Sequence, residues 1–106
     1  MPSLVPSFTP TAASSKIFKA AAGCLHSFSV TSGGDGYVMV FDSATVPADG
    51  TVSPAYCFKI AANTSIAINF EPNPMSLQNG IVIALSSAGP FTKTTSPTGH
   101  IVAQFE

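Results

Sequence analysis

The stretch CLHSFSVTS-GGDG-YVMVF, residues 24–41, decides the fold class. Residues 24–32 alternate between apolar and small polar side chains, the two-residue period of a β-strand with one buried face. Residues 37–41 are apolar at every position, which predicts a central strand buried on both faces. Glycines within residues 33–36 supply the backbone freedom of a turn, so we expect residues 27–32 and 37–42 to form a β-hairpin around it.

Side-chain directions in the first of these strands follow from the alternation. We expect one face to carry His26, Phe28 and Val30, and the other to carry Leu25, Ser27 and Ser29. His26 is therefore expected to be a satisfied core or interface histidine.

The strand-and-turn pattern continues to the end of the chain. Further strands are predicted at residues 55–61, 65–70, 81–86, 91–95 and 100–106. About seven or eight short strands predict an all-β domain, a single small antiparallel β-sandwich or a partly open barrel. Residues 16–24 are rich in alanine and could form a helix, but Ile17 and Phe18 favour an edge strand.

Two segments divide the chain. Residues 1–16 predict an extended N-terminal arm, because Pro2, Pro6 and Pro10 fix φ and remove backbone donors. This arm is either a frayed terminus or a segment that lies across a neighbouring subunit. Residues 17–106 are the expected β-sandwich domain.

Charge is scarce in the 106 residues, which include four Lys, no Arg, five acidic residues and two His, with 45% hydrophobic residues. Soluble monomers draw about a quarter of their residues from the charged set. Copies of a protein with so few charges repel one another only weakly. We therefore expect the protein to be assembled with itself or with other proteins. The scattered lysines argue against a nucleic-acid partner.

No targeting or membrane segment is expected. Residues 1–6 carry neither the basic region nor the apolar run of a signal peptide. No stretch approaches the roughly 18 apolar residues of a membrane span. We therefore expect a protein made in the cytoplasm, with no membrane partner.

The residues show no catalytic constellation. His26 and His100 are the only imidazoles, and Ser27 is expected on the opposite strand face from its neighbour His26. Asp35 and Asp49 precede glycines in turns, where aspartate bonds its own backbone. We expect a protein that is not an enzyme and has no cofactor and no metal site.

The two cysteines, Cys24 and Cys57, are expected to be free thiols rather than a disulfide, because reducing compartments disfavour the bond. Their spacing matches no zinc pattern.

Five runs of residues carry a family resemblance: residues 25–30, 36–42, 47–54, 80–87 and 89–94. They resemble a family of short β-rich proteins encoded by tailed bacteriophages and prophages, and the resemblance covers residues 17–106. It implies a small β-domain encoded beside virion genes, and it carries no site residues over to this chain.

The resemblance leads us to expect a virion location. The favoured function is a capsid decoration or cement protein that binds the major capsid protein; the alternative is a head-fibre, tail or baseplate component, possibly an adhesin-like host-recognition module. A homo-oligomer is expected, with a trimer as the first choice because shell symmetry favours closed rings.

Candidate contact residues lie in the arm and in the long loop of residues 42–54. The arm and loop candidates are Pro2, Leu4, Val5, Pro6, Phe8, Pro10, Val46, Pro47 and Pro54. An adhesin would instead need exposed aromatic side chains, with Tyr37, Tyr56 and Phe91 as candidates.

Overall fold

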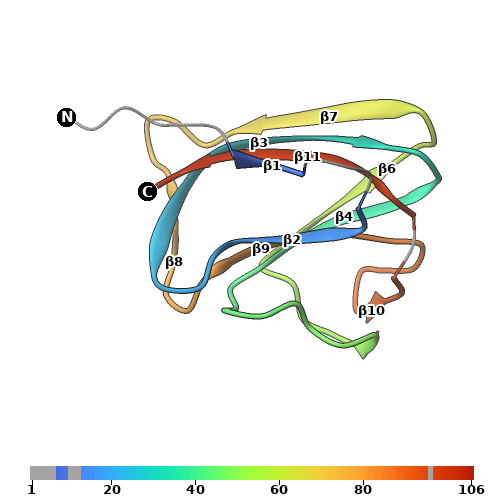
Figure 1. The fold of residues 1–106 in the computed structure, drawn as a ribbon, viewed down its shortest axis with the longest axis horizontal. Helices are drawn as coiled ribbons and strands as arrows, with labels where there is room; N and C mark the ends of the chain where they lie inside the picture. Colours follow the sequence, from blue (N-terminus) through green and yellow to red (C-terminus); the bar gives the residue numbers. More distant parts are fainter. Residues whose placement is uncertain (1–6, 10–12, 96) are drawn as a thin grey trace.

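The computed structural model describes residues 7–9, 13–95 and 97–106, and this part of the chain forms strands and no helix (Figure 1). The strands are β1 (Ser7–Phe8), β2 (Ser15–Lys19), β3 (Gly23–Ser32), β4 (Gly36–Phe41), β5 (Gly50–Thr51), β6 (Tyr56–Ile60), β7 (Thr64–Asn69), β8 (Met75–Leu77), β9 (Ile81–Ser86), β10 (Thr92–Lys93) and β11 (Gly99–Phe105). Seven of these have five or more residues, in agreement with the predicted number of strands.

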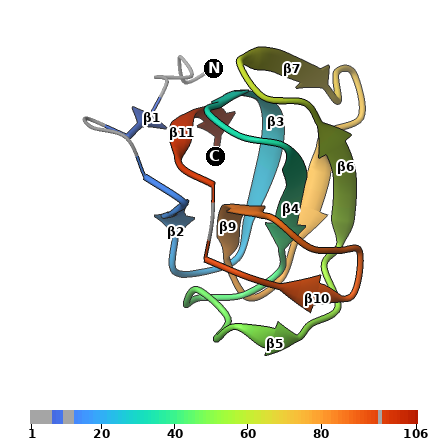
Figure 2. The same ribbon diagram turned by 90° about the vertical axis from the view of Figure 1, so that its right-hand side faces the viewer.

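The strands form two main antiparallel sheets. Sheet A has the order β1-β11-β3-β7, with β8 also paired to β3, and sheet B has the order β2-β9-β4-β6. Figure 1 shows sheet A above sheet B, and Figure 2 shows the short ribbon of β5 and β10 beyond sheet B. Two separate sheets make the fold a β-sandwich rather than a partly open barrel.

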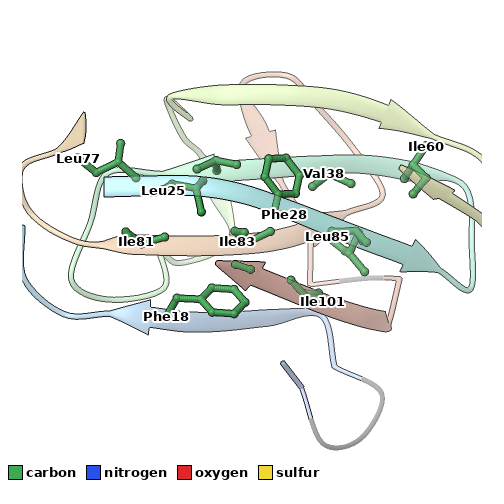
Figure 3. Packing of buried hydrophobic residues seen from close by; sticks show 13 residues of the cluster. Phe18, Leu25, Phe28, Val38, Ile60, Leu77, Ile81, Ile83, Leu85 and Ile101 are labelled. Atoms are coloured by element: carbon green, nitrogen blue, oxygen red, sulfur yellow. The ribbon is translucent and has the colours of Figure 1, made fainter. Parts of the chain in front are cut away.

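The main core lies between the two sheets. Alternate residues of β9 (Ile81, Ile83 and Leu85) are fully buried and meet Phe28 and Ile101 of sheet A (Figure 3). The two-residue period of the strands explains this layer, because each strand directs every second side chain inward.

A second apolar cluster covers the other face of sheet B. Met39 and Phe41 of β4 and Val82 of β9 pack there against Val52 from the long loop. Strands β4 and β9 are therefore buried on both faces, which confirms the prediction for residues 37–41.

The predicted hairpin of residues 27–42 is wrong. Strand β3 pairs with β11, β7 and β8 in sheet A, whereas β4 pairs with β9 and β6 in sheet B. The glycine-rich turn therefore carries the chain from one sheet to the other. A Cβ at Gly36 would lie 2.2 Å from the carbonyl oxygen of Ser86, so close packing of the backbones explains this glycine.

The predicted side-chain directions in β3 are also wrong at its N-terminal end. The register shifts between Gln104 and Phe105 of β11, so that Gln104 pairs with Ser27 and Phe105 pairs with Leu25. This β-bulge leaves His26 as the extra residue, so Leu25 joins Phe28 in the core.

Part of the segment expected as an arm lies on the sandwich. Ser7 and Phe8 form β1 on the edge of β11, and Ser15 and Lys16 begin β2, which pairs with β9. Residues 17–19 are thus strand rather than helix, as predicted. Residues 1–6 and 10–12 lie outside the described residues.

Truncating the central core side chain Leu85 should destabilise the fold strongly. Leu85 is fully buried, so Leu85→Ala is expected to cost about 2–5 kcal/mol through lost burial and the cavity left behind. Urea unfolding measures this loss as a lower midpoint. Ile17→Ala, at a side chain that is 43% exposed on β2, is the matched control and should cost well under half as much. Equal losses in the two variants would contradict the assigned core.

Candidate functional site

The carboxylates of the chain hold its loops. Asp35 Oδ1 accepts a hydrogen bond from the backbone N–H of Ala62 at 2.7 Å, and Asp42 Oδ1 accepts one from Asn79 N–H at 2.7 Å. The bond from Asn79 is the main reason that the pKa of Asp42 lies below its ordinary value. Both aspartates therefore join segments distant in the sequence.

Asp49 fixes the ribbon of β5 and β10. The Lys93 ammonium, only 4% exposed, donates to Asp49 Oδ1 at 2.8 Å. The hydroxyl and backbone N–H of Thr95 donate to the same carboxylate at 2.6 and 2.9 Å. These bonds, that of Lys93 first, lower the pKa of Asp49 to about 2, so the carboxylate is ionised and satisfied.

The two glutamates clamp His26. Its Nδ1 bonds Glu71 Oε1 in the turn after β7, and its Nε2 bonds Glu106 Oε2 at 2.8 Å. Glu71 contributes most, and Glu106 next, to raising the pKa of His26 above 6.5. Both ring nitrogens are thus occupied, and a general base needs one of them free to accept a proton.

This arrangement does not suit a metal ion either. Glu71 and Glu106 bind opposite edges of the imidazole, so they cannot share one cation with it. In the part of the chain that the structure describes, no group of three or more His, Cys, Asp or Glu side chains could hold a metal ion. Cys24 and Cys57 are free thiols, as predicted, and burial raises the pKa of Cys57.

The outer face of sheet A offers the broadest candidate surface. Its residues point away from the core in three cross-strand rows: His100, Thr31 and Ser65; Val102, Ser29 and Ala67; Gln104, Ser27 and Asn69. No Lys, Asp or Glu lies among these nine residues. A shallow groove of about 340 Å³ runs over the second and third rows.

Two hydrogen bonds join side chains within the rows of this face. The hydroxyls of Thr31 and Ser65 lie 2.8 Å apart, and the Ser27 hydroxyl donates to Gln104 Oε1 at 3.2 Å. Phe8, 52% exposed, stands at the β1 edge with its ring centroid 6.1 Å from that of His100. The face therefore combines small hydroxyl and amide groups with one aromatic border.

Only one of the described candidate contact residues from the sequence belongs to this face. Phe8 borders it, whereas Val46, Pro47 and Pro54 lie in the loop that covers the opposite side of sheet B. Val46 packs inward against the Met39 cluster, Pro47 lines a hollow of about 380 Å³, and Pro54 is half-buried. The remaining candidates, Pro2, Leu4, Val5, Pro6 and Pro10, lie outside the described residues.

The candidate aromatic side chains do not form one platform. Tyr56, 45% exposed, stacks on Phe58 at the β6 edge, and Phe91, 63% exposed, precedes β10. Tyr37 is half-buried against the second apolar cluster. The outer face of sheet A was not predicted as a contact surface from the sequence. The alternation of Ser, Ala and Asn with apolar residues in β3 and β7 is the signal that could have revealed it.

No known protein family, curated protein or solved structure matches this chain. The resemblance to phage proteins therefore stays a prediction. Within the described residues, no helix is long and apolar enough to cross a membrane.

Replacing His26 should remove a pH-dependent part of the stability. Because the pKa of His26 is raised on folding, its contribution is full below the unfolded value of 6.5 and is lost as the pH rises through the folded value. Urea midpoints of the wild type and His26→Gln should therefore differ most near pH 6 and converge at alkaline pH. The control is His100→Gln, at an exposed imidazole outside this clamp. A gap that grows with pH would contradict the clamp.

Removing Asp49 should destabilise the ribbon by leaving the Lys93 ammonium buried without its counter-charge. Asp49→Ala is expected to lower the urea midpoint at pH 7, and the loss should shrink as the pH falls from 3.8 towards about 2, where the wild-type carboxylate is itself protonated. The double variant Asp49→Ala/Lys93→Met, which removes both charges, should recover much of the midpoint at pH 7. No recovery would show that packing, not charge, causes the loss.

Proposed function

We propose that this protein is a non-enzymatic structural component of a tailed-phage virion, a decoration protein that binds the major capsid protein through the outer face of sheet A and stabilises the shell. The observation that carries the proposal is the uncharged face itself, nine residues on three neighbouring strands with no Lys, Asp or Glu among them. We assign the protein to a phage particle because residues 17–106 resemble phage-encoded proteins.

Docking to protein suits such a face energetically. Burying an ionised side chain is costly unless a partner neutralises it. This face has no Lys, Asp or Glu, so its partner does not have to supply a neutralising charge. Its hydroxyl and amide groups can each exchange a hydrogen bond with water for one with protein. Small side chains such as Ser29 and Ala67 also let a partner approach the sheet closely.

The engagement of the ionisable groups supports a role without catalysis. Each of the five carboxylates bonds a loop amide, a lysine or His26. A general acid or base at these positions would first have to leave a bond that holds the fold.

Antibody-gold labelling of purified phage particles tests the location, with the recombinant chain as immunogen and particles from cells that carry its gene. Many gold grains over each head are expected. Label at the tail or at one vertex would favour the alternative, a fibre, tail or baseplate component. Particles without label, from cells that contain the protein, would overturn a virion role.

A charge placed on the sheet A face should block binding. Ser29 lies at the centre of the face, between Val102 and Ala67, so Ser29→Lys would bury an unpaired ammonium on docking. Co-sedimentation with particles stripped of their own copy of the protein should fall at least tenfold. Ser53→Lys, in the exposed loop beyond sheet B, is the matched control and should bind as the wild type does. Equal binding of both variants would place the contact elsewhere.

A further inference from the structure

Within the described residues, the strands at the edges of the two sheets differ in protection. Figure 2 shows β1 and β2 on one side of the molecule and β6 and β7 on the other. Strand β2 carries Lys16, Lys19 and a bulge, and β6 carries Lys59. Lysines and bulges at an edge oppose the addition of another strand.

Strand β7, Thr64–Asn69, has none of these devices. It contains no charged residue and no proline, and it keeps an unbroken register with β3 from Thr64 to Asn69. Within the described part of the chain, β3 is its one strand partner. An uncharged, regular edge of this length is a template for a further strand.

The antiparallel pattern identifies the free backbone groups. The N–H of Phe70 donates to His26 C=O at 2.9 Å, so the residues at even positions of β7 bond β3. Ser65, Ala67 and Asn69 therefore direct their N–H and C=O groups to the open edge.

The core is also incompletely covered on this side. Of the six half-buried side chains that pack against the main core, five lie along β6 to β8: Phe58, Ile66, Ile68, Phe70 and Met75. Tyr56, 45% exposed, extends this set, with its ring 5.8 Å from Phe58 and 5.7 Å from Phe70. At the other side of the sandwich, Phe18 is only 9% exposed.

We infer that β7 pairs antiparallel with β7 of a second copy of this chain, about a two-fold axis at Ala67. In this register Ala67 faces itself and Ser65 faces Asn69, so the three residues exchange about six hydrogen bonds. A register shifted by two residues would keep about four. Ile66 then lies opposite Ile68, and the apolar row continues from one copy into the other.

Two observations favour a second copy over an extended peptide of another protein. The strand is neutral and small at its centre, so no like charges meet across the axis. A peptide on β7 would cover sheet A alone and leave Tyr56 and Phe58 of sheet B open. A second copy of the sandwich brings both of its sheets. It can therefore cover the apolar side chains of β7 in sheet A as well as Tyr56 and Phe58 in sheet B.

This pairing predicts a dimer instead of the trimer expected from the sequence. It does not depend on the proposed virion role. The two-fold axis stands perpendicular to the sheet, because identical faces meet on the same side of an antiparallel pair. The outer faces of the two copies therefore join into one continuous uncharged surface.

Disulfide trapping tests the register in a Cys24→Ala/Cys57→Ala background. Ala67→Cys should form a cross-linked dimer on mild oxidation, because Cα atoms in a hydrogen-bonded pair lie about 5.5 Å apart, within disulfide range. Ser65→Cys is the matched control, exposed on the same strand and face. Its counterpart would lie about 13 Å away along the strand, so it should remain uncross-linked. Equal cross-linking of the two would overturn the register.

Sedimentation equilibrium tests the dimer itself. The unaltered chain should sediment at twice its 10.8 kDa mass, and Ala67→Lys, which sets two ammonium groups at the axis, should sediment at 10.8 kDa with an unchanged circular dichroism spectrum. A monomeric or trimeric wild type would overturn the inference. A monomer that still binds particles would leave the proposed function standing, and a dimer that binds none would sink that function alone.

Discussion

The six residues of β9, Ile81–Ser86, are all buried, because sheet B needs an apolar layer on each of its faces. Sheet A covers one face, and the loop of residues 42–55 with the β5–β10 ribbon covers the other. Ser86 anchors this second cover, since its hydroxyl accepts hydrogen bonds from the N–H groups of Ala88 and Thr94. The loops therefore cover the second apolar cluster, and their contacts stabilise the sandwich as those between the strands do.

The few carboxylates of the chain also hold its loops and crossings. Asp35, Asp42 and Asp49 bind backbone or Lys93 at the loops, and the two glutamates close around His26. The carboxylates thus stand at loops and chain crossings, where Asp49 accepts hydrogen bonds from both Lys93 and Thr95. The broad face of sheet A is left with hydroxyls and amides, which solvate it without repelling another protein.

Periodicity predicted the strands well and their partners poorly. The alternation in residues 65–70 and the apolar run at 37–41 agree with the observed burial, because both depend only on side-chain direction. The hairpin failed because the choice of partner for β3 depends on β11, some 70 residues later in the chain. A one-residue bulge at His26, opposite Phe105, left no trace in the local pattern, so the histidine clamp was also out of reach. Predicting the outer face of sheet A would have required the register of β3, β7 and β11, which are distant in the sequence.

Strand β11 lies inside sheet A, between β1 and β3, although it is the last strand in sequence. During translation, β3 and β7 must therefore wait for residues 99–105 before sheet A can close. Such non-local pairing slows folding. A chain that lacks residues 99–105 has none of the three side chains that β11 adds to the uncharged face, His100, Val102 and Gln104, and cannot display that face in full. Chains without β11 are therefore excluded from an assembly that uses this face, so the topology itself selects subunits in which sheet A is closed.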